Sequence, residues 1–455
     1  MVKLKYDLFE SKWFKLLQIS MDVGIIIIGY RLAFFVRFGF DAPQRNIEPF
    51  YRLMPFIILV SILFFHVYLS EEDDSKSYFD RVYFSVVSIA MIQFATVTLS
   101  FFIRGFAFPR SVILISAALQ IMAMAIWKKC LVHVYRKYHR ANRVIIIGGA
   151  ETSSRVVSNI LGLELDHIVV AKDVEGIEGI EETDMEEIDS ICITSDIKGA
   201  EREKIIEHAV SENKALYIVP DFHEIVLRNT VWSQFDDMPV LKARKPSMTL
   251  EQRIYKRIFD LAVALPVLVL FLPLMGIISI LIWIEDKGPV LYRQERLTVG
   301  GRAFMLLKFR TMVVDAEKHT GPVLADLEDD RITAVGKVLR ASRLDELPQL
   351  FNVIKGDLSL VGPRPERAFF YDKYGKVIPE FRHRLSVKAG VTGMGQVFGK
   401  YTTTPKDKLV YDMLYIYSYS ILLDLKILFK TFAILFKSGS AEGNEAEKAE
   451  ASAKE

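Results

Sequence analysis

Four long apolar stretches occupy the first third of the chain, each close to the ~20 residues that a helix needs to cross the core of a bilayer. They lie at about residues 16–36, 50–69, 82–103 and 111–127. Short polar gaps separate them, a spacing that is typical of consecutive membrane spans and not of a buried helical domain. Asp22, Arg31 and Arg52 interrupt the first two stretches and would lie at an interface or face the bundle. We expect a four-span transmembrane domain over residues 1–142.

Basic residues flank these spans on both sides and predict their orientation. They are Lys3, Lys5, Lys12 and Lys15 before the first span and Lys128, Lys129, Arg136, Lys137, Arg140 and Arg143 after the fourth. Lysine and arginine stay in the cytoplasm, and an even number of spans returns the chain to its starting side. The first stretch is too long for a cleaved signal peptide and has no small-residue cleavage site. The remainder of the chain should begin in the cytoplasm.

Short apolar runs alternate with helical or acidic segments over residues 143–250. The runs are Arg143–Gly148, Ile168–Ala171, Ile191–Thr194 and Leu216–Val219. This alternation predicts a small parallel sheet in a Rossmann-like α/β domain. The first turn, Gly148–Ser153, has Ala150 and Ser153 where a dinucleotide fingerprint requires glycine. A structural or regulatory domain is favoured, and nucleotide binding stays open as the weaker alternative.

A fifth apolar run, Leu261–Ile284, contains Pro266 and Pro273. Its length would let a straight helix cross the membrane, but proline removes a backbone hydrogen bond and kinks a helix. If the run crosses, everything after residue 285 lies outside the cell. If it bends back at Pro273, the soluble parts share one face. Periodicity alone does not choose between these topologies.

Composition narrows the possible functions. Lys and Arg number 58 against 56 Asp and Glu, so the net charge of +2 gives no field for binding nucleic acid. Two cysteines, Cys130 and Cys192, cannot build a disulfide framework or a cysteine-rich metal site. Residues 408–437 suit either an amphipathic helix on the membrane surface or a core helix. Residues 438–455 predict a disordered tail.

Residues 285–400 carry the candidate chemistry. Leu347, Leu350, Phe351 and Ile354 have helical spacing, which predicts a helix over Asp345–Lys355 with Asp345 as its N-cap. Asp345 and Glu346 would then lie at the positive end of a helix dipole. Such a pair usually only caps a helix. The functional interpretation is that the two carboxylates handle phosphate with Mg²⁺, because a carboxylate can attack phosphorus and a metal offsets the charge.

Several motifs follow one another along the chain, and their order favours the catalytic interpretation of the Asp345–Glu346 pair over helix capping. They are K-R-x-x-D at Lys256–Asp260, G-P-x-x-x-x-Q-x-R at Gly288–Arg296, K-F-R-T-M at Lys308–Met312, D-E-L-P-Q-L-x-N-V at Asp345–Val353, S-L-V-G-P-R-P at Ser359–Pro365, T-G-x-x-Q-V-x-G at Thr392–Gly399 and L-D-L-K-I-L at Leu423–Leu428. With them, residues 251–436 resemble the bacterial sugar transferase family, the monotopic phosphoglycosyl transferases. The preceding spans and α/β domain resemble the long form that initiates exopolysaccharide or capsule assembly.

The resemblance implies a membrane protein of the α plus α/β class with three parts. These are a four-helix transmembrane bundle over residues 1–142, a Rossmann-like domain over 143–250 and a monotopic catalytic domain over 251–437 with a re-entrant helix at 261–284. It further implies transfer of a sugar 1-phosphate from a UDP-sugar to undecaprenyl phosphate in the bacterial inner membrane, with the catalytic domain in the cytoplasm. Glucose and galactose lead as sugars on family frequency alone, and a homodimer is left open.

The resemblance also implies roles for individual residues. Asp345 would be the nucleophile, and Glu346 its partner, with Mg²⁺ at the pair. The residues expected to hold phosphates or nucleotide are Lys308, Arg310, Arg340 and Arg364. Asp424 would be a structural or substrate-binding acid. The residues expected on the membrane and polyprenol side are Lys256, Arg257, Asp260 and Pro273.

The chain departs from the family pattern at four places, where Leu272 replaces a serine before Pro273, Ala389 a proline, Met394 a large aromatic residue and Lys400 an arginine. The last three flank the expected substrate pocket, so they leave the sugar undefined. Two other functions compete. A membrane-tethered nucleotide-sugar dehydratase or epimerase would need a glycine fingerprint and Tyr-x-x-x-Lys, and the sequence has neither. A non-catalytic scaffold would tolerate substitution of Asp345.

Overall fold

The computed structural model describes most of the chain, in two compact units that divide between Val219 and Pro220. The described residues are 12–69, 78–102, 109–138, 142–161, 168–174, 176, 185–313, 331–399 and 403–435. The predicted tail at 438–455, the basic residues Lys3, Lys5 and Arg140, and the departure at Lys400 lie outside them.

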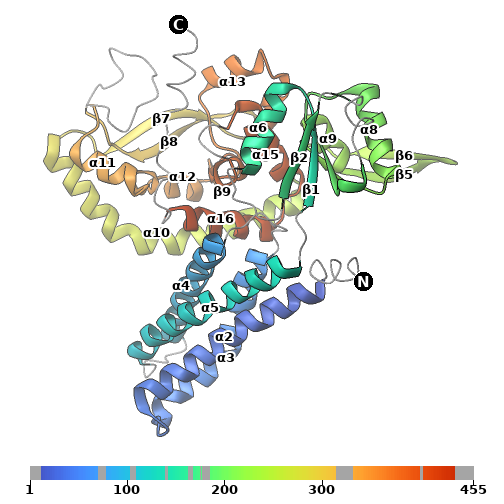
Figure 1. The fold of residues 1–455 in the computed structure, drawn as a ribbon. Coiled ribbons are helices and arrows are strands. Elements are labelled where there is room, and N and C mark those ends of the chain that lie inside the picture. Colours follow the sequence, from blue (N-terminus) through green and yellow to red (C-terminus); the bar gives the residue numbers. More distant parts are fainter. Residues whose placement is uncertain are drawn as a thin grey trace. The chain divides into compact units, whose positions relative to one another are not determined.

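Four long helices open the first unit (Figure 1). They are α2 (Lys12–Phe38), α3 (Gln44–Leu69), α4 (Tyr78–Phe102) and α5 (Arg110–Tyr138). Each is long and apolar enough to cross a membrane. The predicted membrane character is therefore confirmed, and the four apolar stretches coincide with four helices.

Several polar side chains inside this helical part are paired with one another. Asp22 of α2 is fully buried, and its carboxylate accepts hydrogen bonds from Lys128 Nζ at 2.7 Å and Trp127 Nε1 at 2.9 Å. Such pairing is required because an unpaired charge among apolar helices is costly. Arg52, by contrast, is exposed and pairs with Glu48 one turn away. Asp22 thus faces the interior of the helical part, whereas Arg52 does not.

A four-stranded parallel sheet with strand order β2-β1-β3-β4 completes the first unit. Its elements are β1 (Asn142–Ile147), α6 (Ala150–Leu161), β2 (Ile168–Val174), the 3₁₀ turn η1 (Met185–Glu187), β3 (Ser190–Ile193), α8 (Gly199–Ser211) and β4 (Ala215–Ile218). The two central strands, β1 and β3, are the most deeply buried, as expected for strands covered on both faces. The prediction of a small parallel α/β sheet is confirmed.

The second unit contains short strands and helices around the long helix α10. Its first elements are α9 (Phe222–Arg228), β5 (Thr230–Phe235), β6 (Met238–Ala243), α10 (Leu250–Asp286), β7 (Leu291–Leu297), η2 (Val299–Gly301), β8 (Ala303–Phe309) and α11 (Ala334–Ala341). The remaining ones are η3 (Leu344–Glu346), α12 (Gln349–Lys355), β9 (Ser359–Val361), α13 (Ala368–Gly375), η4 (Pro379–Ser386), β10 (Gly390–Thr392), α14 (Met394–Val397), α15 (Pro405–Tyr417) and α16 (Ile421–Leu435). Residues 220–250, which the sequence grouped with the α/β domain, lie in this unit.

Helix α10 runs through both Pro266 and Pro273 without interruption, and its ribbon curves along its length (Figure 1). At 37 residues it is also long and apolar enough to cross a membrane. One stripe of its residues is buried against the unit, from Lys256 and Asp260 to Ile278 and Ile282. The other side exposes large apolar residues, which suits contact with lipid rather than water.

The segment at 408–437 forms two helices rather than one. Helix α15 ends at Tyr417, and α16 begins at Ile421. Both helices bury apolar residues in the core of the second unit, including Met413 of α15 and Ile427 of α16. The core-helix alternative therefore describes this segment better than a single helix lying on a membrane.

Candidate active site

The Asp345–Glu346 pair lies in a single 3₁₀ turn, η3, rather than at the start of a helix. Arg343 has a left-handed backbone with φ of 57° and begins this turn. Helix α12 starts only at Gln349, so the predicted N-cap role of Asp345 is wrong. Pro348 contributes to this, because it has no N–H for an α-helical bond to Leu344 O, and that carbonyl instead accepts from Leu347 N at 3.2 Å. The positive field around Asp345 therefore comes from side chains and not from a helix dipole.

Lys308 of β8 is the cation that lies closest to the two carboxylates. Its Nζ is 2.7 Å from Glu346 Oε1 and 3.8 Å from Asp345 Oδ2. Lys308 pairs across the β7–β8 hairpin with Tyr292, so the strand register fixes its position. All three charged side chains are at least three-quarters buried. Low exposure strengthens the interaction, because water screens it less.

The two neighbouring carboxyl groups have opposite pKa shifts. Burial raises the pKa of Asp345 above its ordinary value of 3.8, Lys308 offsets this only in part, and the charge of Glu346 raises it further. Burial also acts to raise the pKa of Glu346, but Lys308 and Arg364 outweigh it and lower this pKa to about 2. Glu346 is thus the firmly ionised member, while the charge on Asp345 is the less stabilised one.

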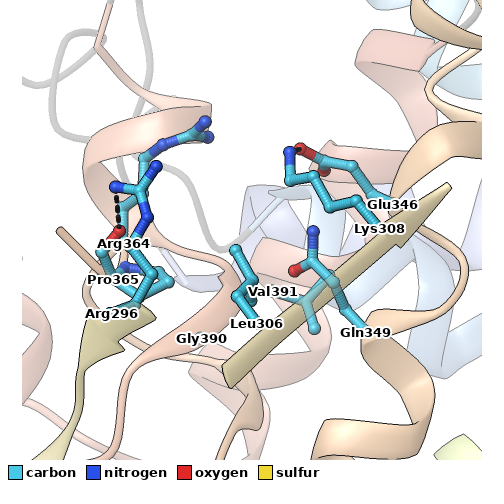
Figure 2. Close-up of a pocket in the computed structure, with 9 residues that line it drawn as sticks. All are labelled: Arg296, Leu306, Lys308, Glu346, Gln349, Arg364, Pro365, Gly390 and Val391. Carbon is cyan, nitrogen blue, oxygen red and sulfur yellow. Dashed lines mark hydrogen bonds and ion pairs between the residues drawn. The ribbon is translucent and has the colours of Figure 1, made fainter. Parts of the chain in front are cut away.

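A pocket that is partly open to solvent lies beside the pair. It is lined by Arg296, Leu306, Lys308, Glu346, Gln349, Arg364, Pro365, Gly390 and Val391. Figure 2 shows Lys308 and Glu346 on one side of the pocket and the two arginines on the other. Asp345 adjoins the pocket through Lys308. Cationic groups on opposite walls suit a ligand with more than one phosphate.

The two arginines differ in how their side chains are held. Arg296 of β7 donates to Gln294 Oε1 at 2.6 Å, to the carbonyl of Pro365 at 3.1 Å and to Glu366 Oε2 at 3.3 Å. Arg364 lies in the turn that follows β9. Within the described part of the chain, no carboxylate bonds the guanidinium of Arg364, which leaves it available to an anion.

Mg²⁺ was expected at Asp345 and Glu346. These two carboxylates suit the ion only if other ligands complete its coordination. Among the described residues there is no group of three or more histidine, cysteine, aspartate or glutamate side chains that could hold a metal. Mg²⁺, however, often binds one or two protein carboxylates together with substrate phosphates and water. The pair fits a magnesium ion that arrives with a phosphate ligand, not a permanent all-protein site.

The structure brings some of the predicted phosphate-binding residues together and not others. Lys308 and Arg364 line the pocket, and Arg340, which donates to Thr311 Oγ1 at 2.9 Å, acts electrostatically on Asp345. Arg310 lies elsewhere, because its guanidinium forms a close ion pair with Asp286 at the end of α10.

Asp424, Lys256 and Asp260 form a separate buried cluster. Lys256 Nζ is 2.9 Å from Asp260 and 2.7 Å from Asp424, and Asp260 also accepts a hydrogen bond from Ser359 Oγ at 2.8 Å. Lys256 and Asp260 therefore face the protein interior rather than lipid. The cluster joins α10 and α16 to strand β9, which leads directly to Arg364.

Arg257 and Pro273 also have structural positions. Arg257 donates to the carbonyls of Val353 and Ile354, at 2.6 and 2.7 Å, and so adds hydrogen bonds to the carbonyls near the end of α12. Pro273 lies inside the continuous helix α10. Arg257 thus links the membrane helix to the helix that follows the carboxylate pair.

Arg296, Gln349 and Glu366 were not assigned roles from the sequence. Arg296 and Gln349 do occur within the quoted motifs, so their presence was visible, but their place in the pocket was not. The hairpin register places Arg296 and the start of α12 places Gln349, whereas Glu366 pairs with Arg296, and none of these positions can be read from spacing.

Known proteins resemble the part of the chain that carries this site. Residues 251–438 match the family model described as bacterial sugar transferase. The chain is 44% identical over 179 residues to a UDP-N-acetylgalactosamine-undecaprenyl-phosphate N-acetylgalactosaminephosphotransferase of Aeromonas hydrophila, covering 39% of this chain and 42% of that protein. It is 50% identical over 130 residues to a putative undecaprenyl-phosphate N-acetylgalactosaminyl 1-phosphate transferase of Bacillus subtilis, covering 29% of this chain and 72% of that protein.

A third relative is the UDP-glucose:undecaprenyl-phosphate glucose-1-phosphate transferase of Caulobacter vibrioides. It is 40% identical over 193 residues, which are 41% of this chain and 71% of that protein. The chain thus spans less than half of the Aeromonas relative and over two thirds of the other two. With its motifs, its carboxylate pair and these matches, the chain belongs to the bacterial sugar transferase family of phosphoglycosyl transferases.

Proposed function

We propose that this protein transfers a sugar 1-phosphate from a UDP-sugar to undecaprenyl phosphate through a covalent intermediate on Asp345. The observation that carries the proposal is the pairing of a buried carboxylate of raised pKa with a firmly ionised neighbour and a shared lysine, beside a pocket walled by Arg296 and Arg364. A poorly stabilised carboxylate is a nucleophile, and the arginines suit a diphosphate.

In the first step, a carboxylate oxygen of Asp345 bonds to the phosphorus that bears the sugar. The bond between that phosphorus and the oxygen bridging the two phosphates breaks, and UMP leaves with the electron pair. Lys308 lies within reach of the attacking group and offsets the growing negative charge. Arg296 and Arg364 orient the phosphates from the opposite wall of the pocket.

In the second step, a phosphate oxygen of undecaprenyl phosphate attacks the same phosphorus and releases the Asp345 carboxylate. The product is a lipid diphosphate carrying the sugar. The two steps let a soluble donor and a lipid acceptor use one site in turn. Asp345 and Glu346 would hold Mg²⁺ together with the phosphates, and the ion would supply neutralisation of phosphate charge.

The sugar is a hexose or its 2-acetamido derivative. The relatives are named for glucose, galactose and N-acetylgalactosamine, and the two of highest identity described above are named for N-acetylgalactosamine. Family frequency favours glucose or galactose, so a donor panel should contain all three UDP-sugars. Purified protein with undecaprenyl phosphate and Mg²⁺ would identify the donor by its kcat/KM.

A stoichiometric release of UMP tests the mechanism. Enzyme mixed with donor and Mg²⁺, without lipid, should release at most one UMP per active site and carry a sugar-phosphate mass on the Asp345 peptide. Asp345→Asn should release no UMP and carry no sugar-phosphate mass. Glu346→Gln should give both signals at a reduced rate. Intersecting initial-rate lines with no adduct would instead indicate direct transfer in a ternary complex.

We further propose that the α/β part of the first unit and the catalytic part of the second unit both face the cytoplasm of a bacterial inner membrane, with α10 entering and leaving on one side. UDP-sugars are cytoplasmic, and the basic residues after the fourth span favour this orientation. Single cysteines at the exposed positions Lys204 and Val377, with Cys130 and Cys192 replaced by serine, report the side of each unit. Labelling of Val377→Cys in intact cells by an impermeant reagent, without labelling of Lys204→Cys, would show that α10 crosses.

A further inference from the structure

A buried ion pair lies behind the turn that presents Arg364. Arg384 Nε is 2.6 Å from Asp412 Oδ2, and the two side chains are only 3% and 4% exposed. The Arg384 guanidinium also lies over two aromatic rings, at 4.6 Å from the centroid of Phe381 and 5.9 Å from that of Tyr371. This arginine is therefore fixed by a charge, by ring stacking and by burial.

This arginine also contacts the backbone of the turn. Arg384 Nη2 donates to the carbonyl of Arg364 at 3.3 Å. One side chain thus connects Asp412 of α15 to the main chain of the arginine in the pocket.

The turn itself is held almost entirely through its carbonyl groups. Pro363 and Pro365 have no backbone N–H, so the turn has few donors of its own. Instead, the four successive carbonyls of residues 363–366 each accept from a different group. The donors are Gly390 N at 2.9 Å, Arg384 Nη2 at 3.3 Å, Arg296 Nη1 at 3.1 Å and Leu297 N at 3.1 Å, in that order.

Packing alone does not require a charged pair at this place. Apolar residues of similar volume often replace a buried ion pair without loss of stability. What Arg384 supplies and an apolar residue cannot is a donor of fixed direction, aimed at the Arg364 carbonyl. Asp412 compensates the buried charge and sets the orientation of the guanidinium.

We propose that Arg384, oriented by Asp412, is a positioning residue that fixes Arg364 for the donor phosphates. This inference rests on the proposed function, in which Arg364 contacts the donor. Arg384 itself lies behind the turn and acts only through Arg364. Its effect on transfer should therefore exist only while Arg364 is present.

The test is a double-mutant cycle on kcat/KM for the UDP-sugar. Arg384→Lys keeps a charge against Asp412, but a single ammonium group cannot reproduce the forked donors. We expect a loss of about 10- to 100-fold, as for a catalytic group displaced by a fraction of its size. In an Arg364→Ala background, the same change should alter kcat/KM less than about two-fold. Equal losses in both backgrounds, or no loss in either, would overturn the proposal.

Arg382→Lys is the matched control. Arg382 lies two residues away on the same segment and pairs with Asp372 at 3.1 Å, but both side chains are more than 60% exposed. It should leave kcat/KM unchanged in both backgrounds. If Arg384→Lys does not accumulate, the double variant Arg384→Met/Asp412→Leu removes both charges at once and should show the same dependence on Arg364.

UDP binding separates this inference from the proposed function. Calorimetry on the full chain in detergent measures the affinity for UDP. We expect the unaltered protein to bind UDP, and the Arg364→Ala and Arg384→Lys variants to bind it more weakly. If the unaltered protein does not bind UDP, the proposed donor is wrong. If it binds UDP and only Arg364→Ala weakens the binding, the role of Arg384 alone is wrong.

Discussion

The turn after β1 in the first unit and the pocket of the second unit both contain groups that could bind an anion. They differ in whether those groups are already bonded to the protein's own carboxylates. In the first, the amide of Gly149 at the start of α6 donates to Asp196 Oδ2 at 2.6 Å, and Thr194 Oγ1 also bonds that carboxylate. Burial opposes ionisation of Asp196, but these donors hold its pKa below the ordinary 3.8. The protein's own carboxylate thus accepts a hydrogen bond from a backbone amide of the kind that binds phosphate in a dinucleotide-binding turn.

In the second unit, not every cationic side chain at the pocket forms an ion pair with a carboxylate of the described residues. Lys308 is shared by two carboxylates, while the guanidinium of Arg364 has no carboxylate partner among the described residues. The comparison teaches that a turn of the right shape is not sufficient for an anion site. Donors must also remain unoccupied, and this condition favours a structural α/β domain and a catalytic second unit.

Matched substitutions of two aspartates should show the largest contrast. Asp345→Asn removes the nucleophile, and we expect transfer to fall at least about 10³-fold. Asp196→Asn keeps an oxygen that can accept from Gly149, and transfer should stay within about two-fold. The measurement is kcat/KM with the best UDP-sugar of the panel. Comparable losses from both changes would mean that the α/β domain takes part in the reaction.

Lys308→Met should have the next largest effect, a loss of about 100-fold in kcat/KM. Lys308 lowers the pKa of both carboxyl groups, so its removal should move the acid limb of the pH–rate profile to higher pH. Lys337→Met, an exposed lysine on α11, is the control and should leave the profile unchanged. An acid limb at the same pH in the Lys308 variant would show that neither carboxylate controls the rate.

The two carboxyl groups of the pair should affect stability in opposite directions. The pKa of Glu346 falls from 4.5 to about 2 on folding, so its charge stabilises the fold above pH 4.5 and this contribution is lost as pH falls toward 2. Glu346→Gln should therefore destabilise the second unit at pH 7 by on the order of 2 kcal/mol.

The pKa of Asp345 is raised on folding, so its charge costs stability above that pKa, and Asp345→Asn should raise or preserve the Tm. Thermal unfolding of both variants at pH 7, next to the unaltered protein, measures the difference. A lower Tm for Asp345→Asn than for Glu346→Gln would contradict the assignment of the two pKa shifts.

The smallest effect on transfer should come from Gly148→Ala. A Cβ at Gly148 would lie 1.9 Å from Thr194 Oγ1, so the closed turn must open or shift. We expect a loss of about 1–3 kcal/mol in the stability of the α/β domain and little change in transfer. Glu151→Ala, an exposed change on the first turn of α6, is the control. Proteolysis of the full chain should show faster cleavage of the first unit in the Gly148 variant only.

Several features of this protein could be predicted from the sequence alone. The long apolar stretches and the parallel strands of the α/β domain follow from local periodicity, which depends on residues close together in the chain. The family motifs identified Asp345, Glu346, Lys308 and Arg364 as candidates, and the structure places all four at or beside one pocket.

Other features were decided only by the tertiary structure. Arg310 and Lys308 are two residues apart, yet strand β8 and its flank direct one to Asp286 and the other to Glu346. Lys256 is bonded to Asp424, 168 positions away, and Arg384 reaches the carbonyl of Arg364. Ion pairs and carbonyl contacts of this kind depend on register and on which helix packs where, and sequence spacing does not contain that information. The sequence motifs identify the candidate residues, but only the tertiary structure determines which other residues they contact.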